Sequence, residues 1–178
     1  MMYVSAKEER RNVIVRHKRA SDVGAIAEAT QAAFENRPYS HQTEQHIVAV
    51  LKEAGAMTIS LVADMDGKVV AHAAFSPIAI SDGTANWYGL GPISVLPEHQ
   101  RQGIGKALMY EGLRLLQEMG ANGCALMGDP IHYVRFEFRS VPELAHEGVP
   151  QEDVLVLHFG ENRPTGALVF HDVFLATG

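Results

Sequence analysis

Short runs of alternating apolar and polar residues, and longer runs with a helical period, divide this chain into strands and helices. Val13 and Val15 alternate with polar neighbours and predict a first strand over 12–17. Apolar residues three or four apart predict helices, which are expected from the N-cap Ser21-Asp22 through Ala33, over 42–54, over 101–119 and, briefly, over 132–136. The other strands are expected at 58–63, 68–75, 86–95, 124–127, 151–159 and 167–173.

Glycine-rich turns separate these segments and set their order. Asp66-Gly67 is typical of a hairpin turn, and Ser81-Asp82-Gly83 marks another turn. Pro92 lacks a backbone N–H, so the strand over 86–95 must carry a bulge there or part from its neighbour. Gly112 lies on the apolar stripe Ile104, Ala107, Leu108, Leu115 and Met119, and is expected to let that helix approach the sheet closely. Strands on both sides of helices predict an α/β (α+β) fold with a mixed sheet.

Composition limits the classes of protein and the partners. A length of 178 residues suits one domain, spanning 1–178. The net charge is −6, although six basic and two acidic side chains give residues 1–19 a charge of +4 and leave −10 for the rest. This acidic body argues against nucleic acid as a partner and favours a cationic small molecule. No apolar run is long enough to span a membrane, and the single cysteine, Cys124, fits a cytoplasmic location.

The segment 93–108 carries the strongest chemical signal. It predicts a strand, a proline, a loop with Gly103 and Gly105, and then a helix. Unpaired N–H groups and the helix dipole make such a helix start an anion site, and glycines let a phosphate approach the backbone. Arg101 and Lys106 add positive charge. The segment lacks both the Gly-Lys-Ser/Thr of a P-loop and the dinucleotide fingerprint, and a glycine pair here also serves as a tight turn without a ligand.

Two motifs occur in order along the chain: Ile93-x-Val95-x-Pro97-x-x-Gln100-x-x-Gly103-x-Gly105, and Tyr133-Val134-Arg135-Phe136-Glu137-Phe138. They resemble the acetyl-coenzyme A (acetyl-CoA) signature and the Tyr-x-x-x-Gly-Phe element of the GNAT N-acetyltransferase superfamily. Gly128-Asp129-Pro130 is similar to one branch of small bacterial members. The strand order agrees with that family over about 12–140, with further strands over 150–175. The resemblance implies a mixed, mostly antiparallel central sheet with splayed fourth and fifth strands, flanked by helices.

The resemblance also implies how acetyl-CoA binds. The backbone of the splayed strand pairs with the pantetheine arm, and the amides of residues 102–106 hold the pyrophosphate. Adding the flanking side chains, the predicted acetyl-CoA site consists of Ile93, Ser94, Val95, Gln100, Arg101, Gln102, Gly103, Ile104, Gly105 and Lys106. Gln100 replaces the commoner arginine of the family, which tolerates either residue.

The implied reaction is attack of a neutral primary amine on the acetyl carbonyl, through a tetrahedral intermediate. The backbone N–H of Val95 is expected to stabilise the oxyanion. Tyr133 has the family position of the general acid for the departing thiolate; alternatively, its ring only packs under the ligand. The general base is open among Glu98, His99, Asp129, His132 and His72, of which Glu98 and His99 are expected on the loop surface. Asp129 is the first to test because it leaves a core strand toward the site, although Asp-Pro also favours a plain turn.

Several points stay open. The histidine spacing predicts no metal site. Trp87-Tyr88 precedes the predicted acetyl-CoA strand and either forms a wall of the acceptor pocket or packs in the core. Glu137 replaces the family's usual glycine and is expected to tilt the turn that carries Tyr133. The acceptor is a small-molecule or peptide amine, including protein N-termini or lysines. A non-catalytic acyl-CoA sensor is the alternative function, and the edge strands of this fold suggest a homodimer.

Overall fold

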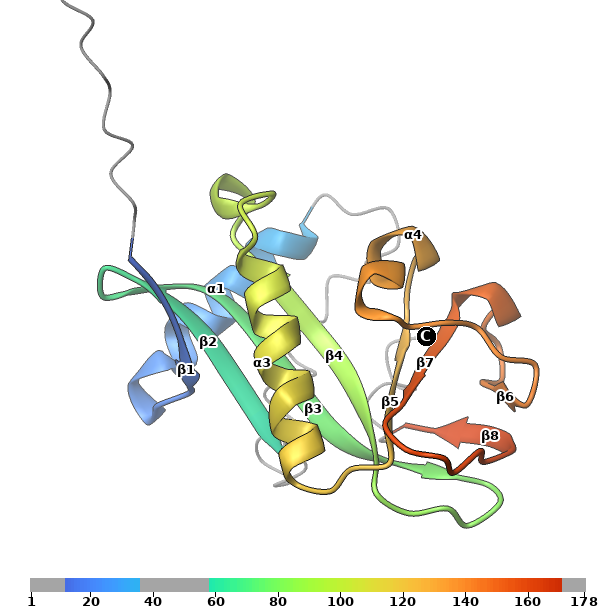
Figure 1. Ribbon diagram of the computed structural model, residues 1–178. Coiled ribbons are helices and arrows are strands. Elements are labelled where there is room, and N and C mark those ends of the chain that lie inside the picture. The colour runs from blue at the N-terminus through green and yellow to red at the C-terminus, as the bar shows by residue number, and fades with distance from the viewer. Residues whose placement is uncertain (1–11, 36–57, 171–178) are drawn as a thin grey trace, which may run out of the picture.

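The computed structural model describes residues 12–35 and 58–170 (Figure 1). Its strands are β1 (Val13–His17), β2 (Ile59–Met65), β3 (Lys68–Ile80), β4 (Trp87–Val95), β5 (Gly123–Met127), β6 (Leu144–Ala145), β7 (Val154–His158) and β8 (Gly166–Val169). Its helices are α1 (Val23–Phe34), α3 (Ile104–Glu118) and the one-turn α4 (Pro130–Tyr133). The helix expected at 42–54 and the end of the strand expected at 167–173 lie outside the described residues.

A central sheet in the order β1-β2-β3-β4-β5-β7 organises the described chain. Its neighbours are antiparallel except β4 and β5, which run parallel. β8 pairs with the far end of β3, and β6 pairs with β8. Helices α1 and α3 lie on opposite faces of the sheet (Figure 1). This arrangement confirms the predicted fold class, a mixed and mostly antiparallel sheet flanked by helices.

The contact between β4 and β5 is short, and the two strands then part. The pairing joins only Trp87–Gly89 to Gly123–Ala125, so the remainder of β4 has no partner on the β5 side among the described residues. On its other side β4 carries a bulge, because its register with β3 shifts between Ala73 and Phe75 where β4 inserts Gly91-Pro92. The strand therefore both carries a bulge at Pro92 and parts from a neighbour, the two outcomes expected from this proline, and β4 is left with one open edge.

Helix α3 rests on the sheet through a narrow strip of close contact. A Cβ atom at Gly112 would overlap the Phe75 ring, which confirms the predicted close approach. The expected stripe was wrong at two positions: Ala107 and Met119 are exposed, whereas the helix buries Met109, Leu113 and Leu116. The contact between Gly112 and Phe75 fixes the rotation of the helix, and that contact lies on β3, far away in sequence.

Gly112→Ala is expected to destabilise the protein by about 1–3 kcal/mol, because the added methyl group overpacks the Phe75 ring. Gly24→Ala is the matched control, since a Cβ at this exposed position of α1 meets nothing within 4 Å. Alanine there is expected to leave stability unchanged or raise it by up to about 1 kcal/mol. Urea unfolding of both variants measures the difference, and equal effects would contradict the close approach.

The layer between the sheet and α1 contains a buried polar row. The side chain of His72 is fully buried, and its Nε2 lies 2.7 Å from Ser60 Oγ. Beside it, Ser94 Oγ donates to Thr30 Oγ1 at 3.1 Å, and Thr30 Oγ1 donates to the Ile26 carbonyl at 2.8 Å. Burial, and to a lesser extent the charge of Lys18, lowers the pKa of His72 to about 4. His72 is therefore neutral in the folded protein at neutral pH.

Acidification is expected to weaken the fold through His72. Its pKa is lowered from 6.5 to about 4 on folding, so between these values the unfolded chain binds a proton that the folded chain does not. The free energy of unfolding should fall by about 2 kcal/mol from this group between pH 7.5 and pH 5. Urea titrations at both pH values measure the fall in the free energy of unfolding. His72→Gln should show a fall that is smaller by the contribution of His72. An equal fall in the variant and in wild type would mean that other groups cause it.

Candidate active site

The open edge of β4 presents backbone groups toward the gap between β4 and β5. The N–H of Leu96 donates to the Val70 carbonyl of β3 at 2.9 Å. Because backbone groups along a strand alternate between its two sides, those of Ile93 and Val95 point away from β3. The side chain of Ser94 points toward α1. An extended ligand beside β4 would therefore meet outward-facing N–H and C=O groups two residues apart.

The loop after β4 ends in a cluster of unpaired amides. Arg101 and Gly103 both have left-handed backbone, with φ of 61° and 82°. The N–H groups of residues 101–106 have no acceptor within the described part of the chain. A Cβ at Gly103 would meet nothing within 4 Å, and one at Gly105 would reach only Val95 Cγ2, at 3.6 Å. The start of α3 therefore combines free donors with space for a bulky anion, directly beside the end of β4.

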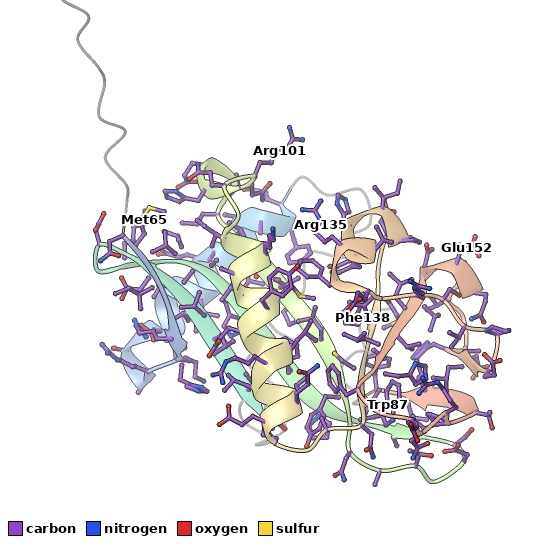
Figure 2. All side chains as sticks on the ribbon, viewed as in Figure 1. Met65, Trp87, Arg101, Arg135, Phe138 and Glu152 are labelled. Atoms are coloured by element: carbon purple, nitrogen blue, oxygen red, sulfur yellow. The ribbon has the colours of Figure 1, made fainter. Side chains whose placement is uncertain are left out.

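The Gln100 side chain joins β4 to the loop that follows it, a structural role that the sequence did not indicate. Gln100 Nε2 donates to the Val95 carbonyl at 3.0 Å. This bond fixes the last residue of the open edge relative to the amide cluster. The charged residues are arranged differently. Arg101 projects outward from the tip of the loop (Figure 2), whereas the Lys106 ammonium lies 5.8 Å from the centroid of the Tyr110 ring on α3.

The two candidate bases in the short 3-10 turn Pro97–His99 differ in their exposure to solvent. Glu98 is exposed, as expected, and its carbonyl accepts from Gln102 Nε2 at 3.2 Å. The expectation that His99 lies on the surface is wrong, since only 9% of it is exposed. Its N–H donates to the Leu96 carbonyl at 2.8 Å, and this turn folds the imidazole inward. His72 is buried on the α1 side of the sheet, so neither histidine reaches solvent freely.

Tyr133 lies beyond the carboxyl end of β5, on the other side of the gap. Asp129 Oδ1 accepts from the Ile131 N–H at 2.9 Å and caps α4, which carries Tyr133 in its last position. The half-buried Tyr133 ring packs on Gly128, where a Cβ would lie 2.7 Å from the ring. It also contacts Phe138 edge to face, at a centroid distance of 6.3 Å. The cap, the glycine and the phenylalanine together fix the orientation of the ring.

Trp87 and Cys124 are core residues. Trp87 is 1% exposed and meets the His158 ring edge to face at 5.3 Å, so the core interpretation of this residue is correct. Tyr88 is half-buried on the α3 face. Cys124 is fully buried, and burial raises the pKa of its thiol, as expected for a packed core residue. Among the described residues, no three His, Cys, Asp or Glu side chains gather as a metal site, and no helix is long and apolar enough to cross a membrane.

Comparison with known proteins places this geometry in a family. The model of the acetyltransferase (GNAT) family matches residues 25–129, which is more than half of the chain. The chain belongs to the GNAT family. The matched GNAT segment contains the open edge of β4 and the amide cluster, and it ends at Asp129, four residues before Tyr133.

Solved GNAT structures resemble this chain over most of its length. A GNAT family acetyltransferase from Brucella melitensis, solved with acetyl-CoA, is 41% identical with a TM-score of 0.82, covering 92% of this chain and 99% of that one. YhbS from Escherichia coli, solved with CoA, is 29% identical with a TM-score of 0.85, covering 93% of each chain. In sequence, the uncharacterized N-acetyltransferase YhbS of Escherichia coli K12 is 36% identical over 107 residues, which span 60% of this chain and 64% of the relative.

Glu137 occupies the position of the usual glycine in the second GNAT motif, and its backbone explains that preference. Its φ of 69° and ψ of 13° are left-handed, a conformation that disfavours residues with a Cβ. The turn after α4 thus keeps a glycine-like shape although the side chain is glutamate. The expected tilt of this turn remains a prediction.

Glu137→Gly is expected to stabilise the protein by up to about 1 kcal/mol, because glycine relieves the left-handed strain at a small cost in unfolded-state entropy. Thermal and urea unfolding measure the change. Glu152→Gly is the contrasting control: Glu152 lies in a 3-10 turn and has no positive φ, so glycine there should not stabilise. Equal shifts in both variants would mean that Glu137 is not strained.

Proposed function

We propose that this GNAT chain is an N-acetyltransferase that moves an acetyl group from acetyl-CoA to a primary amine. The observation that carries the proposal is the open edge of β4, which ends directly at the unpaired amides of residues 101–106. A ligand that combines an extended amide-bearing arm with a pyrophosphate matches both parts. The Brucella and Escherichia coli relatives, solved with acetyl-CoA and CoA, support this choice of ligand.

Each part of acetyl-CoA has a proposed place. The amides of the pantetheine arm would pair with the outward N–H and C=O of Ile93 and with the second acceptor position of the Val95 carbonyl, as an added strand does. The pyrophosphate would accept from the N–H groups of residues 102–106, where the α3 dipole adds positive potential. Gln100 would hold these two regions in register through the Val95 carbonyl. Arg101 and Lys106 would contribute charge at the rim.

The acetyl carbonyl supplies the electrophile, and the protein residues would handle the charge and the protons. The Val95 N–H would donate to the oxyanion formed when the amine attacks. As the tetrahedral intermediate collapses, the Tyr133 hydroxyl would give its proton to the departing thiolate. Asp129 Oδ1 is engaged in the cap of α4, so Oδ2 would take the proton of the amine, through water. The proton that Asp129 would take from the amine balances the proton that Tyr133 would give to the thiolate, so the products would be the acetylated amine and free CoA.

The remaining parts of the proposal concern the whole protein. We infer one acyltransferase domain over residues 1–178, working in the reducing environment of the cytoplasm. The acceptor would be a small-molecule or peptide amine, and the acidic body favours a cationic one. A homodimer would cover the edge strands of the sheet.

A turnover assay tests the function. Purified protein is incubated with acetyl-CoA and a panel of polyamines, amino sugars, amino acids and peptides, and released thiol and acetylated product are both measured. Amine-dependent thiol release with matching product supports the enzyme. Tight binding of acetyl-CoA without turnover on any amine would replace it by the alternative, a GNAT module that senses acyl-CoA. Failure to bind acetyl-CoA would overturn both.

A further inference from the structure

A shallow hollow with a volume of about 280 Å³ lies at the outer edge of β7. It is lined by residues of the segment 137–141, by the end of β7 and by Arg163. Arg139 and Val156 exchange both backbone hydrogen bonds, at 3.0 and 2.9 Å, so their side chains lie on the same face of the sheet. Alternation along β7 adds His158 to that face, and Val141 packs against the same core cluster as Val156, whereas Phe138 belongs to the core cluster beneath α3.

The hollow brings together charges that are rare in this part of the chain. Only three basic residues follow Gly120, namely Arg135, Arg139 and Arg163, and the last two line the hollow. Arg139 is exposed, and its guanidinium has no acceptor among the described residues. Arg163 Nη1 is fixed by the Gly160 and Asn162 carbonyls, at 2.6 and 3.0 Å, which leaves its other N–H groups available. Two available guanidinium groups in one hollow form a site for a carboxylate.

The remaining lining residues add an opposite charge and an apolar floor. Glu137 lines the hollow and is exposed, and its backbone keeps a left-handed conformation that glycine would adopt at lower cost. A strained residue that holds a charged side chain in a hollow is typical of a ligand site. Val141 is partly exposed and supplies apolar surface, and Val156, which is 2% exposed, closes the hollow beneath it. His158 is kept neutral, since burial and then the charge of Arg163 lower its pKa against the opposing effect of Glu143.

We propose that this hollow binds an α-amino acid with an aliphatic side chain. Arg139 and Arg163 receive its carboxylate, Glu137 receives its ammonium group, and Val141 contacts its side chain. The volume lies just below the ~300–1,000 Å³ of pockets for drug-sized ligands, in keeping with a small ligand.

Tyr133 lies outside the hollow, although Phe138, which contacts the Tyr133 ring, stands between the lining residues Glu137 and Arg139. Val156 and His158 pair with Ala125 and Gly123, toward the beginning of β5, whereas Tyr133 packs on Gly128 beyond its end. At about 3.3 Å per residue, the two places are roughly 10 Å or more apart along β5. The proposal therefore does not rest on the acetyltransferase function, and the two can fail independently.

Calorimetric titration of the full chain with L-leucine, in the absence of acetyl-CoA, tests the site. We expect saturable binding at millimolar concentration or tighter. L-Leucinamide lacks the carboxylate and 4-methylpentanoate lacks the ammonium group, so each is expected to bind at least tenfold more weakly. Binding that is equal for all three compounds, or no binding of L-leucine, would overturn the proposal.

Variants locate the binding. Arg139→Gln and Glu137→Gln are each expected to weaken L-leucine binding at least tenfold, and Arg139→Gln keeps the backbone bonds to Val156. Arg135→Gln is the matched control, since Arg135 is also exposed but does not line the hollow. Tyr133→Phe should also leave L-leucine binding unchanged. A loss in Arg135→Gln or Tyr133→Phe equal to that in Arg139→Gln would move the ligand elsewhere and contradict the assignment.

Discussion

Gly103→Glu is expected to weaken acetyl-CoA binding at least a hundredfold. Gly103 precedes α3 in a left-handed conformation, and space is free around its Cα. A glutamate there would bring a carboxylate to the amides that we propose hold the pyrophosphate. Placing two like charges side by side costs about 3 kcal/mol of binding free energy, which corresponds to a hundredfold loss of affinity. Isothermal titration of wild type and variant with acetyl-CoA measures it.

The far end of the same helix provides the control. Gly120 follows α3 with a φ of 81°, nearly the 82° of Gly103, and a Cβ there also meets nothing within 4 Å. Gly120→Glu therefore adds the same side chain and the same backbone strain, away from the amide cluster. It should bind acetyl-CoA as wild type does. Equal affinity in both variants would show that residues 101–106 do not hold the pyrophosphate.

Local sequence signals predicted the parts of the site that local chemistry determines. Gly103 and Gly105 between a strand and an apolar helix predicted a tight loop before a helix, and a left-handed Gly103 directly before α3 is found there. Pro92 cannot donate a ladder hydrogen bond, so the disturbance of β4 was predictable, including the bulge. The turn at Asp66-Gly67 was equally clear, because two successive positive φ values need such residues.

Contacts between distant segments were not predictable in the same way. The inward position of His99 depends on the turn that joins its N–H to the Leu96 carbonyl, whereas its sequence is typical of a polar loop. The pairing of β8 with the end of β3 joins residues about ninety positions apart, and no periodicity encodes it. The hollow beside β7 arises because Arg139 pairs with Val156 outside any regular strand. Each case depends on tertiary packing, which overrides local preference.

Tyr133→Phe is expected to lower kcat about a hundredfold to a thousandfold while acetyl-CoA affinity stays within about twofold of wild type. The substitution removes only the hydroxyl group that we propose protonates the thiolate. The ring contacts with Gly128 and Phe138 remain, so the fold and the ligand site should persist. Steady-state kinetics with an accepted amine give kcat, and calorimetry gives the affinity.

Tyr110→Phe is the control, because it removes a tyrosine hydroxyl group at another position, on α3. Tyr110 is 48% exposed on α3 and contacts Phe136 edge to face at 5.1 Å, a contact that phenylalanine retains. Its kcat should equal that of wild type. A fall confined to Tyr133→Phe, with affinity unchanged, fits loss of a proton donor and not of packing. If Tyr133→Phe turned over as fast as wild type, the ring would serve only as packing beneath the ligand, and the thiolate would leave without a protein acid.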